Sequence, residues 1–137
     1  MNRFYLDTNI LYFTLFETTE LSSDVKAIVS DYANTLYTST VCVMELIQLL
    51  QTRKSSNKNI DIAEIFNILR TYNISIEEVK VRHLEQLIKT PVLHSDPNDR
   101  LIIAQAASDR ITLISSDTQF EKYTKYLKTF TFVHNKR

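Results

Sequence analysis

The sequence has no glycine, a single cysteine and only two prolines, and the missing glycine excludes the most. Loops that cradle phosphates or present nucleophiles need a residue without Cβ, so that the backbone can approach a ligand or reach positive φ. The sequence therefore contains no Walker loop, no Rossmann dinucleotide fingerprint and no G-x-S-x-G nucleophile elbow.

The single cysteine and the lack of a long apolar run restrict the setting of the protein. Cys42 can form no internal disulfide and no Cys-x-x-Cys zinc site, and we expect a packed thiol in a reducing cytoplasm. The uncharged stretch near the N-terminus extends only from Thr8 to Phe16, between Asp7 and Glu17. This stretch is too short for a signal peptide or a membrane span, and we expect no membrane association.

The charges balance, with 16 Lys and Arg against 16 Asp and Glu, so only a local basic patch could hold a nucleic acid. Residues 52–59, TRKSSNKN, contain no apolar side chain and predict an exposed connection. Its cations, Arg53, Lys54 and Lys58, are the candidate phosphate contacts. A solvated surface is the favoured alternative, because no aromatic residue is interleaved among them.

The length of 137 residues predicts one domain over residues 1–137. Short β-rich runs alternate with longer helical patterns, which predicts an α/β fold with a central parallel sheet flanked by helices. We expect strands at 4–6, 36–39, 112–115 and 130–133, and either a strand or an extended link at 74–76. The expected helices cover 8–16, 24–33, 41–53, 79–88 and 99–110, with Thr40 as the N-cap of the third and Asp61 beginning another.

Three acids, Asp7, Asp99 and Asp117, occupy similar places, each at or beyond a strand end or at a helix start. Because ligands bind beyond the carboxyl ends of parallel strands, these carboxylates are expected to share one edge. Taken singly, each is more simply a helix cap. A fourth acid, Glu45, lies in the most apolar helix and needs a partner, since an unpaired buried charge costs several kcal/mol.

Carboxylates that converge repel one another unless a cation neutralises them, and an all-oxygen cluster suits Mg²⁺ or Mn²⁺. Such ions lower the pKa of a bound water and stabilise the attacking and leaving oxygens of a phosphodiester. The set of four acids therefore indicates metal-dependent hydrolysis more strongly than any one of them.

Around these acids the sequence resembles the PIN-domain ribonucleases, and among them the VapC-like toxins of toxin-antitoxin pairs. The matching pieces are FYLDTNILY, TSTVCVMELIQ, HSDPNDRLIIAQA and LISSDTQFEKY, in the family's order. The resemblance implies a Mg²⁺- or Mn²⁺-dependent endoribonuclease, with metal-site roles for Asp7, Glu45, Asp99 and Asp117. It also implies three partners: an RNA such as tRNA, a small antitoxin whose C-terminal segment lies over the acids, and a second copy in a homodimer.

The same resemblance suggests supporting residues. Ser115 is expected to donate a hydrogen bond near the last acid, and Asn9 to orient Asp7. Asp96 precedes Pro97 and is expected to form an Asx-turn, although it could also touch metal. Arg100 is expected to pair with a carboxylate, or else to meet RNA phosphate.

Two neighbouring residues of the HSDPND segment are expected to be structural. Asn98 departs from the hydrophobic or small residue usual before the third acid and is expected to improve the helix cap. His94 is expected to be a hydrogen-bonded structural residue, since a site with oxygen ligands does not need it.

Two other functions remain open on the sequence. One is a non-catalytic PIN-fold protein that binds an antitoxin-like peptide or RNA without cutting it. The other is a phosphatase-like enzyme with Asp7 as nucleophile, although Thr8-Asn9 lacks the second Asp expected there.

Overall fold

A parallel sheet of five short strands forms the centre of the computed structural model, which describes residues 2–52 and 61–136. The strand order is β3-β2-β1-β4-β5, and every neighbouring pair is parallel. The strands are β1 (Arg3–Leu6), β2 (Thr35–Ser39), β3 (Ile74–Glu77), β4 (Thr112–Ser115) and β5 (Phe132–His134). The expected parallel α/β fold is confirmed, and the segment left open at 74–76 is a strand.

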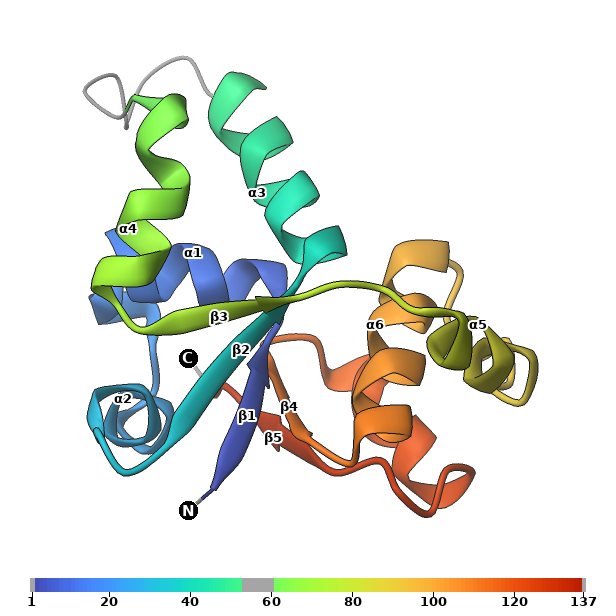
Figure 1. The fold of residues 1–137 in the computed structure, drawn as a ribbon. Helices are drawn as coiled ribbons and strands as arrows, with labels where there is room; N and C mark the ends of the chain where they lie inside the picture. The colour runs from blue at the N-terminus through green and yellow to red at the C-terminus, as the bar shows by residue number, and fades with distance from the viewer. Residues whose placement is uncertain (1, 53–60, 137) are drawn as a thin grey trace.

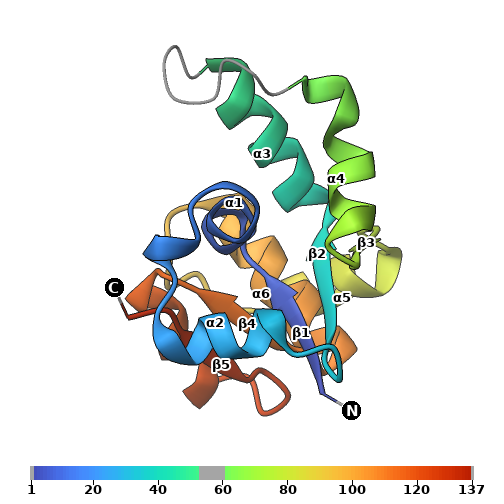
Figure 2. The ribbon, with the colours of Figure 1, turned by 90° about the vertical axis from the view of Figure 1, so that its left-hand side faces the viewer.

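Helices cover both faces of the sheet. Figure 1 shows α1 and α2 on one side and α5 and α6 on the other, while α3 and α4 extend beyond the ends of β2 and β3; Figure 2 shows α1 and α2 from the front. The α-helices are α1 (Thr8–Phe16), α2 (Ser23–Ser30), α3 (Thr40–Thr52), α4 (Ile65–Thr71), α5 (Val81–Ile88) and α6 (Pro97–Asp109). Three 3₁₀ helices, η1 (Thr18–Glu20), η2 (Ile62–Glu64) and η3 (Thr118–Lys125), complete the described elements.

Two helices begin earlier than the sequence pattern indicates. Helix α3 includes Thr40, and the side-chain oxygen of Ser39 accepts the N–H of Val41, so the expected cap at Thr40 is wrong. Helix α6 begins at Pro97 with Asp96 as its N-cap, so neither Asp99 nor Asn98 caps it. In both cases a side chain nearer the N-terminus satisfies a free N–H of the first turn.

The core lies on both faces of the sheet. Leu6, Ile10, Leu46, Ile103 and Leu113 belong to one cluster of fully buried side chains. Cys42 is also fully buried, as expected, and burial raises the pKa of its thiol above the usual range. No helix among the described residues is both long and apolar enough to cross a membrane.

The strand order places a switch point beside β1. The chain leaves β1 toward β2 on one side, and later returns to β4 on the other. The N–H of Asp7 donates to the carbonyl of Ile114 at 3.0 Å, which joins the ends of these two strands. At such a point the loops diverge and leave a crevice at the carboxyl edge of the sheet, where ligands bind in this class of fold.

Candidate active site

The crevice at this edge is an acidic cleft of about 460 Å³. Asp7 follows β1, Asp117 follows β4, Glu45 lies on α3, and Asp99 lies in the first turn of α6. All four expected acids line the cleft and lie at one edge of the sheet. The described lining consists of Asp7, Thr8, Asn9, Glu45, Gln48, Leu49, Thr52, Asp96, Asp99 and Asp117.

Asp7 is buried and is held by two donors. The N–H of Thr8 donates to its Oδ1 at 2.8 Å, and the hydroxyl of Ser115 donates to its Oδ2 at 2.7 Å. Burial raises the pKa of Asp7 to about 6, against the lowering effect of these two hydrogen bonds, and the charges of Glu45 and Asp117 raise it further. The sequence alone left the depth of this burial open.

Ser115 connects two acids, because its oxygen also accepts the N–H of Asp117 at 3.1 Å. The hydrogen bond expected near the last acid is therefore present, and it reaches Asp7. Asn9 is exposed on the cleft, and no described hydrogen bond joins it to Asp7. The donor that orients Asp7 from the DTN segment is instead the backbone N–H of Thr8.

Glu45 has the partner that its position demanded. The Thr8 hydroxyl donates to its Oε1 at 2.6 Å, and the Asn98 amide donates to its Oε2 at 3.4 Å. Asn98, expected as a helix cap, thus reaches across from α6 to α3. Neither partner follows from the sequence, because each lies far from Glu45 along the chain.

The pKa of Asp99 is raised further than that of Asp7. Burial is the main cause that raises its pKa to about 7, and the negative charges of Asp7 and Asp96 add to it. Asp96 itself forms the expected turn, since its Oδ1 accepts the N–H of Asn98 at 2.9 Å. It lines the same cleft and adds a further carboxylate to it.

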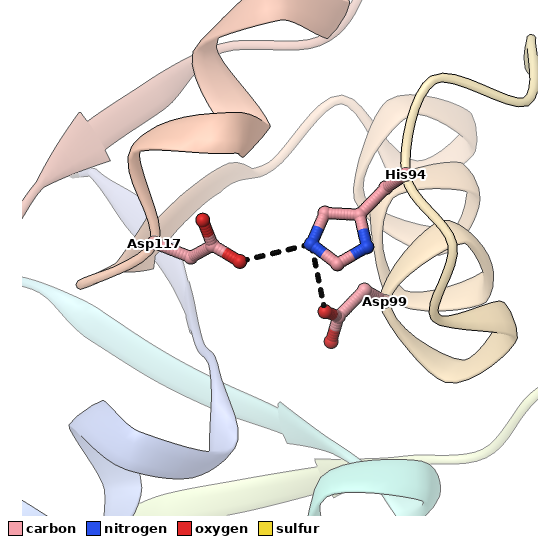
Figure 3. Close-up of side chains that lie close together, drawn as sticks. All are labelled: His94, Asp99 and Asp117. Atoms are coloured by element: carbon pink, nitrogen blue, oxygen red, sulfur yellow. Dashed lines mark hydrogen bonds and ion pairs between the residues drawn. The ribbon is translucent and has the colours of Figure 1, made fainter.

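His94 is hydrogen-bonded, as expected, but it lies closer to the acids than the sequence analysis indicated. Its ring lies between two acids, with Nε2 at 3.0 Å from Oδ2 of Asp117 and 3.4 Å from Oδ2 of Asp99 (Figure 3). One ligand atom from each of these three residues falls within a group no wider than 4.8 Å. The only signal in the sequence was the place of His94 inside the HSDPND segment.

The loop that carries His94 is anchored at both ends. The hydroxyl of buried Tyr123 accepts the N–H groups of Leu93 and His94, each at 3.0 Å. Arg100 donates from Nη2 to the carbonyl of Thr90 at 2.9 Å. No ion pair among the described residues includes Arg100, so the carboxylate partner expected for it is wrong: its guanidinium is turned toward the loop.

The negative charge of the cleft is not balanced by the protein around it. Its described lining contains no Lys or Arg, and His94 is the one basic side chain in the described part of the chain that lies within 4 Å of Asp99 or Asp117. Burial is the main cause of the raised pKa values of Asp7 and Asp99, and the uncompensated negative charges of neighbouring acids add to it. A divalent cation would relieve this repulsion, and the oxygen donors are those that Mg²⁺ or Mn²⁺ prefers.

A comparison of the sequence with known families decides the classification. The family model of the PIN domain matches residues 4–126. The chain belongs to the PIN domain family. This match begins within β1 and ends before β5, and it includes every acid of the cleft. No curated protein has a significantly similar sequence.

The PIN fold is confirmed by solved structures of low sequence identity. One is a crystal structure of VapBC2 from Rickettsia felis bound to a promoter DNA fragment, with a TM-score of 0.71 at 15% identity, covering 98% of this chain and 99% of that one. Another is FitAcB from Neisseria gonorrhoeae, with a TM-score of 0.69 at 16% identity and 96% of each chain covered. VapBC-5 from Mycobacterium tuberculosis, described as a member of the VapBC family of toxin-antitoxin systems, gives 0.66 at 14% identity and covers 98% and 99%.

The candidate phosphate contacts of this PIN domain cannot be placed beside the cleft. Arg53, Lys54 and Lys58 lie outside the described residues. Described residues of α3 line the cleft as far as Thr52, the last residue of that helix.

Proposed function

We propose that this PIN domain is a Mg²⁺- or Mn²⁺-dependent endoribonuclease, and the toxin of a toxin-antitoxin pair in the cytoplasm. The observation that carries the proposal is the cleft itself, which five carboxylates line, the four expected acids and Asp96, with no Lys or Arg in the described lining. Carboxylates in such a group raise one another's pKa values unless they bind a cation. A purely structural set of helix caps would not need to line one cleft.

In this mechanism Asp7, Glu45, Asp99 and Asp117 would hold the ion. Once bound there, such an ion would lower the pKa of a water and stabilise charge on the phosphodiester. The chain supplies the orientation of the acids: Ser115 fixes one oxygen of Asp7, and Thr8 fixes one oxygen of Glu45. With no Ser, Cys or Lys nucleophile implied by the family, water is the attacking group.

An antitoxin segment is the protein partner that we propose for the cleft and the adjoining surface of α3. An apolar groove of about 440 Å³ runs between α3, α4 and β3, and half-exposed Met44 and Phe66 line it. Gln48 lines both this groove and the acidic cleft. A peptide with apolar residues in the groove would thus reach the acids, as in the helix-in-groove mode of recognition.

Cleavage of total RNA and of tRNA by the purified protein, with Mg²⁺, Mn²⁺ or EDTA, tests the nuclease. We expect cutting that needs the metal and that Asp7→Asn abolishes. Asp24→Asn is the matched control, because Asp24 is an exposed acid in the first turn of α2 and does not line the cleft. Equal cutting by Asp7→Asn and the wild type would refute the mechanism.

The same experiment judges the alternative of a binding protein that does not cut. If the folded, metal-loaded wild type leaves both RNA preparations intact, while titration calorimetry detects no Mg²⁺ or Mn²⁺ binding, the non-catalytic alternative is supported. Metal binding with an affinity that falls in Asp7→Asn, but not in Asp24→Asn, supports the enzyme.

A further inference from the structure

We infer that His94 is a positioning residue, which orients Asp117 by donating its Nε2–H to that acid and keeps the ring beside Asp99. The inference rests on the proposed function, because that function gives the acids their metal-binding role. The hydrogen bond from His94 to Asp117 is already present in the metal-free protein. Nε2 lies 3.0 Å from Oδ2 of Asp117 and 3.4 Å from Oδ2 of Asp99 (Figure 3). His94 lies in the loop between α5 and α6, outside every helix and strand.

The hydrogen-bond partners of the ring define its tautomer. The backbone N–H of Asp96 lies 3.1 Å from Nδ1 of His94 and can only donate, so Nδ1 must present its lone pair. The proton of the neutral ring is then on Nε2, where it faces the two carboxylates. One neutral histidine thus accepts from its own loop and donates to Asp117, with no need for a positive charge.

The ring is also fixed in place by contacts outside the acids. The backbone N–H groups of His94 and of its neighbour Leu93 both donate to the hydroxyl of Tyr123. The ring packs edge-on against fully buried Phe120, with centroids 5.9 Å apart and an interplanar angle of 75°. A donor held this firmly counters the repulsion between Asp99 and Asp117, which would otherwise separate them.

The rival role is that of a metal ligand, since His94 belongs to the group within 4.8 Å. Ligation through Nε2 requires a lone pair there and therefore moves the proton to Nδ1. Two donors, Nδ1–H and the N–H of Asp96, would then face each other across 3.1 Å. Ligation would break the hydrogen bond from the N–H of Asp96 to the ring, whereas donation keeps it intact.

Nitrogen NMR of the histidine rings tests the tautomer in the protein without metal and with saturating Mg²⁺. We expect the Nε2–H form of His94 in both conditions. His83 is an internal reference, because its Nδ1 accepts the N–H of Lys80 and its Nε2 faces Asp109, away from the cleft. A proton on Nδ1 of His94 in the metal-free protein overturns the inference, and a switch to Nδ1–H with Mg²⁺ shows a ligand instead.

Two substitutions separate the two functions of the ring. The amide nitrogen of Gln can take the place of Nε2, so His94→Gln keeps a donor for the acids. Asn places its polar atoms near Nδ1, so His94→Asn keeps only an acceptor for Asp96. In calorimetric titration with Mn²⁺, we expect Asn to weaken binding by about 10- to 100-fold, the range for partners that orient metal ligands, and Gln to recover most of this loss.

The controls keep the failure of this inference apart from the failure of the proposed function. His83→Asn makes the same change at a histidine outside the cleft and should leave Mn²⁺ affinity as in the wild type. Equal affinities of His94→Asn and wild type overturn the inference even if RNA is cut. A wild type that neither binds Mn²⁺ nor cuts RNA refutes the nuclease, while the NMR tautomer still decides the role of His94.

Discussion

Replacing Asp7 with Asn is expected to stabilise the metal-free protein while it removes activity. Asp7 is only 6% exposed, and burial holds its pKa at about 6 in the folded state, against an ordinary value of 3.8. The folded protein thus keeps this proton to a higher pH than the unfolded chain. Binding of this proton stabilises the folded state. The stabilisation is fully present below pH 4 and is lost as the pH rises through about 6.

The magnitude follows from the difference of about two pKa units. Each unit corresponds to about 1.4 kcal/mol, so the wild type loses up to about 3 kcal/mol between pH 4 and pH 7 through this group. Asn carries no charge at any pH and escapes the loss. It can still accept the N–H of Thr8, while its amide group meets the Ser115 oxygen, which changes the stability by a constant amount at all pH values.

Urea denaturation of both proteins in EDTA, at several values between pH 4 and 8, measures the effect. The free energy of unfolding of Asp7→Asn minus that of the wild type should increase by about 1–3 kcal/mol over this range. Addition of Mg²⁺ should then stabilise the wild type more than the variant. A difference that stays constant with pH would refute the reasoning, because it would mean that Asp7 is not destabilised by burial.

Three further predictions concern contacts of the site and the surface. Tyr123→Phe removes the acceptor of two backbone N–H groups, and urea denaturation should show a loss of about 1–3 kcal/mol; an unchanged midpoint would contradict this anchoring role. Thr8→Val removes the donor to Glu45 and should weaken Mn²⁺ binding about tenfold in calorimetry, whereas Thr8→Ser should not; equal values would argue against orientation by the hydroxyl. The homodimer remains a prediction, and Ile88→Glu, at an 87% exposed site on α5, should yield monomer by light scattering without loss of stability; an unchanged mass would place the dimer contact elsewhere.

Local patterns predicted the strand ends and therefore the acids. Asp7 and Asp117 follow runs such as FYL and TLIS, whose alternation with helices already required a parallel sheet. In such a sheet the carboxyl ends meet at one edge, so the convergence of the acids follows from topology alone. The helix starts were less well predicted, because Ser39 and Asp96 compete with Thr40 and Asp99 as caps one to three residues apart.

The contacts that orient the acids could not be predicted, because each joins distant parts of the chain. Thr8 and Glu45 are 37 residues apart, and Ser115 and Asp7 are 108 apart. The pairing of a hydroxyl with a carboxylate depends on where α1, α3 and β4 end in space. No spacing within one segment carries that information, and a serine after a strand has many other uses.

The two histidines of the central segment show why the sequence alone could not place His94 beside the acids. Both His83 and His94 accept a nearby backbone N–H at Nδ1 and face an aspartate through Nε2. Asp109, the partner of His83, is engaged by Arg82 and by the hydroxyl of Tyr5 as well, so its charge is compensated by donors around it. Asp99 and Asp117 have no described Lys or Arg partner, and His94 is left as the donor between them. The same local bond therefore lies beside a compensated acid at His83 and beside uncompensated acids at His94, and the role that we infer for His94 depends on this difference in the surroundings of the carboxylate.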